Sequence, residues 1–75
     1  MHNLSINELR AFTTVVDVGG FTQAGRLLGR SQPTISLQIK RLEEQIGALL
    51  FVRKGKVLEL TPSGSKLRKY ALEIL

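Results

Sequence analysis

The chain has 75 residues, which is enough for one small domain that buries about 60% of the surface of the unfolded chain. It has no cysteine, so disulfides and cysteine zinc sites are excluded, and its single histidine, His2, adjoins Met1 at a terminus where fraying is expected rather than a ligand or catalytic role. The net charge of +5 is concentrated between residues 26 and 56, which hold seven Lys or Arg against two acids, and this concentration favours a polyanion partner.

Two helices are expected before residue 30. Ser5 and Glu8 form an S-x-x-E capping box, and the apolar face that follows ends before Gly19 and Gly20. A second helix is predicted from about residue 22 to residue 28, with Gly29 as a left-handed exit. Its buried side is expected to consist of Phe21, Ala24, Leu27 and Leu28. The small Ala24 and Gly25 should let the third helix approach closely.

The third helix has the clearest pattern. Its apolar residues recur at spacings of four, three and four, which places them on one stripe that must face a core: Ile35, Ile39, Leu42 and Ile46. Ser31 can cap this helix, Pro33 is tolerated in its first turn, and Gly47 supplies a left-handed stop. We therefore expect a helix-turn-helix whose second helix begins after Ser31.

The opposite side of this third helix suits a negatively charged groove lined with hydrogen-bonding groups. It lacks acids near its N-terminus and is followed by two cations, and its residues are Gln32, Pro33, Thr34, Ser36, Leu37, Gln38, Lys40 and Arg41. Spacing alone leaves a second interpretation open for residues 31–33, because serine and proline serve a plain helix cap as readily as a contact surface.

Residues 49–60 predict a β-hairpin with a basic tip. Two β-prone segments flank Lys54 and Gly55, and Leu58 and Leu60 alternate on the returning strand. The cations at this tip are Arg53, Lys54 and Lys56. They are placed to reach a polyanion, although the same residues could form only a solvated rim.

A fourth helix is predicted to open at Thr61 and Pro62, an N-cap followed by proline at the first helical position. Its apolar positions are Leu67, Tyr70, Ala71, Ile74 and Leu75. The pattern reaches the last residue without a stop signal. Such a helix is either frayed or the start of a longer helix that pairs with another chain.

Three helices, a basic hairpin and a further helix form a winged helix-turn-helix, which makes the fold class mainly α. The chain resembles the N-terminal DNA-binding domain of LysR-type bacterial transcription regulators. The resemblance rests on LRAFTTVVDVGGFTQAGRLLGRSQPTISLQIKRLEEQIGALLF and on LTPSG, and it covers nearly the whole chain from residue 4 to residue 75.

The resemblance implies a DNA-binding domain over residues 1–61 and the start of a linker helix over residues 62–75. It further implies double-stranded DNA with an inverted-repeat operator as the partner, and a homodimer or higher oligomer in the full-length regulator. A small-molecule effector would act only through a periplasmic-binding-protein-like domain that is absent here. No cofactor and no metal are implied.

The resemblance also assigns site residues. Base-edge and backbone contacts go to Gln32, Pro33, Thr34, Ser36 and Leu37; phosphate contacts to Thr22, Gln23 and Lys40; wing contacts to Arg53 and Lys56. Their neighbours Arg30, Ser31, Arg41 and Lys54 complete the expected DNA-binding set. The linker resemblance assigns dimerisation to Leu67, Ala71, Ile74 and Leu75. The chemistry of two residues agrees, because the Gln32 amide can pair bidentately with adenine and Ser36 lies one turn further along.

Four positions depart from the family pattern. The usual arginine is Leu37, the second alanine of a usual pair is Gly25, Arg30 precedes Ser31, and Val52 replaces an acid often found in the wing. Leu37 lies about 200° around the helix from the buried stripe, so it should face the groove. It is either a tolerated exposed leucine or a contact to a thymine methyl or sugar, with the lost guanidinium partly replaced by Arg30 or Arg41.

Sequence-specific DNA binding is the leading interpretation of function. The alternative is a winged-helix protein-interaction module with an incidental basic face, and an amphipathic role at a membrane surface comes third. The apolar runs are only a few residues long, so we expect no transmembrane helix or signal peptide and a cytoplasmic location. Enzyme activity is not expected, because the sequence has no nucleophile–base–acid set. Glu43 and Glu44 should face solvent or a helix partner and are not a catalytic dyad, because adjacent helical residues point about 100° apart.

Overall fold

The chain forms the winged helix-turn-helix that the sequence predicted. In the computed structural model, which describes residues 4–75, the elements are α1 (Ile6–Val18), α2 (Phe21–Leu28), α3 (Gln32–Ile46), β1 (Phe51–Lys54), β2 (Val57–Leu60) and α4 (Pro62–Ile74). His2, for which a frayed terminus was expected, lies outside the described residues. None of the helices in residues 4–75 has both the length and the hydropathy needed to cross a membrane.

The predicted caps set the helix boundaries. The Ser5 side chain accepts a hydrogen bond from the Glu8 N–H at 3.4 Å, and the Ser31 side chain accepts one from the Thr34 N–H at 3.3 Å. The α3 helix ends where Gly47 adopts a left-handed conformation with φ of 80°. Local sequence signals therefore decide where these helices begin and end.

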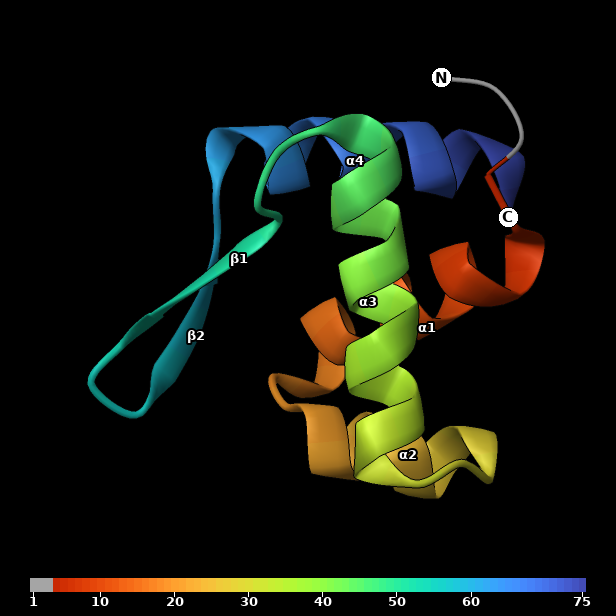
Figure 1. The fold of residues 1–75 in the computed structure, drawn as a ribbon, viewed down its shortest axis with the longest axis vertical. Helices are drawn as coiled ribbons and strands as arrows, with labels where there is room; N and C mark the ends of the chain where they lie inside the picture. The colour runs from red at the N-terminus through yellow and green to blue at the C-terminus, as the bar shows by residue number, and fades with distance from the viewer. Residues whose placement is uncertain (1–3) are drawn as a thin grey trace.

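The core lies where α3 crosses the other helices. Figure 1 shows α3 upright, with α2 at the level of its N-terminal end and α4 running across its C-terminal end. The predicted stripe is buried, since Ile35 and Leu42 are fully inaccessible and Ile39 is 3% exposed. The remaining buried apolar residues are Leu9, Ala11, Phe12, Val15, Ala24, Leu50, Leu67 and Ala71.

The hairpin is anchored at its base and free of the body at its tip. Phe51 pairs with Leu60 at the base, and Lys54 pairs with Val57 beside a turn formed by Gly55 and Lys56. The Phe51 ring centroid lies 5.4 Å from that of Phe12. Figure 1 shows the strands projecting away from the helices beyond this base. The basic tip is thus held out as a wing.

The predicted buried side of α2 is wrong at Leu27, which is 68% exposed. The buried residues of α2 are Ala24 and Gly25. The buried face is centred between them, and Leu27 lies about 110° away around the helix at 100° per residue. Leu27 therefore faces solvent although its spacing from Ala24 is helical.

The α4 helix belongs partly to the same core. Leu67 and Ala71, predicted as dimerisation residues, are 1% and 0% exposed within the single chain. They pack where α4 meets α1 and β2, so they do not share one accessible face with Ile74 and Leu75. This corrects the expected four-residue surface. The division of the chain at residue 61 stays a prediction, and packing continues across it.

Glu43 also departs from expectation. Its carboxylate oxygen accepts a hydrogen bond from the Leu50 N–H at 2.9 Å, and its backbone carbonyl accepts one from the Gly47 N–H at 2.8 Å. The side chain is half-buried and joins the end of α3 to the segment entering β1. Glu44 is exposed, as expected. The first of the two acids is a structural residue rather than a solvent-facing one.

Candidate nucleic-acid interface

The outward face of α3 is accessible along its N-terminal half. Leu37 is 47% exposed, which confirms the helical phase predicted for it. Gln32, Pro33 and Thr34 are exposed as well, and Ser36 is half-buried. No Asp or Glu occurs in α3 before Glu43. This half of the helix can therefore approach a polyanion without an opposing charge.

Two side-chain pairs organise the start of α3. The hydroxyls of Ser31 and Thr34 lie 2.9 Å apart, and Ser31 also caps the helix. The Gln32 amide nitrogen donates to the Ser36 hydroxyl at 2.7 Å. An amide carries two N–H donors and one acceptor oxygen, so this bond orients the Gln32 group and leaves a donor and an acceptor for a base. Capping accounts for Ser31, whereas Gln32 takes no part in the cap.

The turn before α3 depends on close backbone contact at Gly25. The Arg30 N–H donates to the Gly25 carbonyl at 2.8 Å. A Cβ at position 25 would lie 2.4 Å from the Arg30 carbonyl oxygen, so a larger residue would require the turn to move. The prediction that Gly25 permits a close approach is confirmed, and the approaching element is the backbone immediately before α3.

Arg30 lies along the flank of α3. Its guanidinium donates to the Gln38 amide oxygen at 3.3 Å, and the residue is half-buried. Gln38 lies about 100° around the helix from Leu37. Arg30 was one of two arginines expected to replace the guanidinium missing at position 37, and its side chain is directed toward Gln38 instead. Arg41, the other, lies one turn beyond Leu37 on the same side of the helix.

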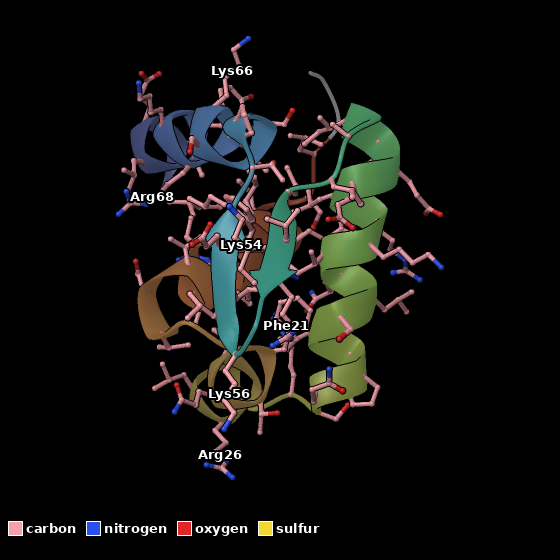
Figure 2. The ribbon with its side chains drawn as sticks, turned by 90° about the vertical axis from the view of Figure 1, so that its left-hand side faces the viewer. Phe21, Arg26, Lys54, Lys56, Lys66 and Arg68 are labelled. Atoms are coloured by element: carbon pink, nitrogen blue, oxygen red, sulfur yellow. The ribbon has the colours of Figure 1, made fainter. Side chains whose placement is uncertain are left out.

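The wing presents basic side chains at its tip. Figure 2 shows the Lys56 side chain extending from the turn, at the end of the molecule where α2 carries Arg26. Arg53, Lys54 and Lys56 are all exposed. Among residues 4–75 the one ion pair joins Lys54 Nζ to Glu59 Oε1 at 3.5 Å, which offsets part of the Lys54 charge. Arg53 and Lys56 are therefore better placed for a polyanion than Lys54.

Outside the wing, polar and basic side chains are exposed on α2, α3 and α4. Thr22, Gln23, Lys40 and Arg41 are exposed on α2 and α3. Arg26 was not among the predicted site residues, although its exposure near the N-terminal end of α3 places it with them. Lys66 and Arg68 lie on α4 at the opposite end in Figure 2. Lys66 and Arg68 are thus separated from the tip of the wing.

The described part of the chain contains no cluster of three or more His, Cys, Asp or Glu able to hold a metal ion. What the arrangement offers is a surface: a helix end with hydrogen-bonding groups, a short helix beside it and a basic hairpin. Such a surface matches the repeating phosphates and base edges of a duplex.

Comparison with known proteins decides the family. The model described as "Bacterial regulatory helix-turn-helix protein, lysR family" matches residues 6–65. The chain belongs to the LysR family. The transcriptional regulator YtlI of Bacillus subtilis is 44% identical over 61 residues, covering 81% of this LysR-family chain and 20% of that protein. The regulator BudR of Klebsiella aerogenes is 43% identical over 72 residues, covering 96% of the chain and 50% of BudR.

Solved structures agree with this LysR-family fold. The BenM DNA-binding domain in complex with benA site 1 DNA superposes with a TM-score of 0.87 at 36% identity, covering 93% of this chain and 79% of that one. Vibrio fischeri DarR in complex with DNA gives 0.90 at 39% identity, covering 96% of this chain and 25% of DarR. The chain spans between a fifth and a half of the length of the two curated relatives named above.

Proposed function

We propose that this LysR-family chain binds double-stranded DNA sequence-specifically, as the DNA-binding domain of a transcription regulator. The N-terminal half of α3 lies in the major groove, and the β1–β2 wing contacts the adjacent minor groove or backbone. The observation that carries the proposal is the exposed, acid-free start of α3 at the same end of the molecule as a projecting basic wing. BenM and DarR, each solved in complex with DNA, support it by similarity.

The proposal divides the site by chemistry. Base edges are read by Gln32 and Ser36, whose bond to each other holds the amide in place before DNA arrives. The residues beside them on α3 contact base edges and backbone: Ser31, Pro33, Thr34 and Leu37. The residues that contact phosphates are Thr22, Gln23, Arg30, Lys40, Arg41, Arg53, Lys54 and Lys56. Phosphate contacts set affinity and register, whereas base contacts set sequence preference.

The proposal extends to assembly. An inverted-repeat operator requires two copies, and the accessible apolar residues at the end of α4 are Leu72, Ile74 and Leu75, which are 63%, 42% and 44% exposed. We propose that these three residues form part of the contact between the two copies in a homodimer. Effector sensing through a further domain rests on the resemblance alone. A cytoplasmic location follows from the proposal, because bacterial chromosomes lie in the cytoplasm, and the proposal assigns no catalysis.

A duplex-binding titration over a range of salt concentrations tests the proposal. With about six phosphates neutralised by the six Lys and Arg side chains named above, log affinity should fall linearly with log salt at a slope of about −5. A site selected from a random duplex pool should bind at least about 10³-fold more tightly than arbitrary duplex. A protein-interaction module would instead bind every duplex weakly and without preference, and that result would contradict DNA readout.

A further inference from the structure

The outward side of α3 carries one large aliphatic side chain. Leu37 is 47% exposed and lies about 190° from the centre of the buried stripe. Its helical neighbours on that side, at positions i−3 and i+4, are Thr34 and Arg41. A leucine that points directly away from the core contributes little to the free energy of folding. Its place at the centre of the proposed interface therefore indicates a role in the complex with DNA.

The major groove offers an aliphatic side chain only one apolar partner. Base edges there present hydrogen-bond donors, acceptors and the 5-methyl group of thymine. A leucine pressed against the amino group of cytosine or the carbonyl of guanine removes water from a polar group without replacing its hydrogen bond, which is unfavourable. Packing on a thymine methyl removes apolar surface from water instead.

We propose that Leu37 is a specificity-determining residue that recognises the 5-methyl group of a thymine in each half-site. The inference rests on the proposed function and deepens it, since it names the chemical group that one residue reads. The Arg30 guanidinium is bonded to Gln38 on the flank of the helix, about 100° away, and so leaves Leu37 to meet the base. The nearby charge comes from Arg41, one turn further on the same side.

Removing the methyl group from the DNA tests this directly. A preferred duplex is selected with the 75-residue chain, and each thymine is replaced in turn by deoxyuridine, which lacks the methyl group and keeps the hydrogen-bonding groups. Affinity is measured by fluorescence anisotropy at fixed salt. At one thymine the unsubstituted protein should lose affinity about fourfold, the equivalent of one buried methyl group. Leu37→Ala should show no loss at that position.

The converse substitution adds a second measurement. With a C·G pair at the same position, 5-methylation of the cytosine should raise affinity about fourfold for the unsubstituted protein and leave Leu37→Ala unchanged. Leu49→Ala is the matched control, because Leu49 is 62% exposed and lies in the segment after α3. This control should retain the full sensitivity to deoxyuridine.

Failure of the inference about Leu37 can be distinguished from failure of the proposed function. A chain that selects a site and shows a steep salt dependence, but whose sensitivity to each deoxyuridine is the same with and without Leu37, refutes the inference and leaves the proposed function standing. A chain that selects no site and shows no salt dependence refutes both.

Discussion

Gly64 lies at a point of close packing where α4 meets the hairpin base. A Cβ built there would lie 2.2 Å from the Leu50 carbonyl oxygen and 2.8 Å from Leu60 Cδ2. The Leu50 carbonyl is not free to move, because it accepts the Thr61 N–H at 3.0 Å. Gly64→Ala should therefore force a backbone shift rather than a change of side-chain rotamer.

The magnitude follows from opposing effects. Overpacking in a tight core costs about 1 to 3 kcal/mol, and weakening the Thr61 to Leu50 hydrogen bond costs about 1 kcal/mol more. Alanine inside a helix regains about 1 kcal/mol relative to glycine. The free energy of unfolding should fall by about 1 to 3 kcal/mol, which lowers Tm by about 4 to 8 °C per kcal/mol in a domain of this size.

Urea unfolding followed by circular dichroism measures the loss. Ser65→Ala is the control, because the neighbouring residue is exposed and its change should stay within about 0.5 kcal/mol. If Gly64→Ala proves as stable as the unsubstituted chain, α4 does not approach the Leu50 carbonyl as described, and the close packing at the hairpin base is wrong.

Substitutions at three further positions test the site and its support. Gln32→Ala should lose about 1 to 3 kcal/mol of binding on the preferred duplex and relax preference at one base pair; an equal loss on all duplexes, measured by competition, would contradict base reading. Lys56→Ala should weaken all duplexes alike and reduce the salt slope by about one, and an unchanged slope would remove Lys56 from the phosphate contacts. Glu43→Ala should lower the free energy of unfolding by about 1 to 2 kcal/mol because it leaves the Leu50 N–H without its acceptor, while Glu43→Gln keeps an acceptor oxygen and should lose less; equal losses in urea unfolding would argue against this hydrogen bond.

The parts of the fold predicted from sequence are those governed by local chemistry. Ser5, Ser31 and Thr61 cap helices because their hydroxyls reach N–H groups three residues on, an interaction that the sequence order itself specifies. The buried stripe that contains Ile35 and Ile39 was also predicted from local sequence, because the spacing of residues along a helix determines the side on which each side chain lies. The exposure of Leu37 followed from that phase.

The mistaken expectations all involve contacts between segments. Leu27 satisfies helical spacing, but the chain reversal before α3 decides which side of the short α2 is covered. Leu67 and Ala71 form an apolar pattern that would suit either a partner chain or the core of this one, and only the position of α1 selects the core. Glu43 meets Leu50 because the chain turns back after Gly47. No periodicity encodes that reversal.

Thr61 joins three parts of the molecule at one residue. Its N–H donates to the Leu50 carbonyl, its hydroxyl donates to the Leu49 carbonyl, and the same hydroxyl oxygen accepts the Gly64 N–H. The segment that enters β1, the residue that follows β2 and the first turn of α4 are consequently bonded together. The base of the wing is also held to α1 by the Phe51–Phe12 ring contact and to α3 by the Glu43–Leu50 hydrogen bond, so the direction of α4 and the orientation of the wing are set together at this residue.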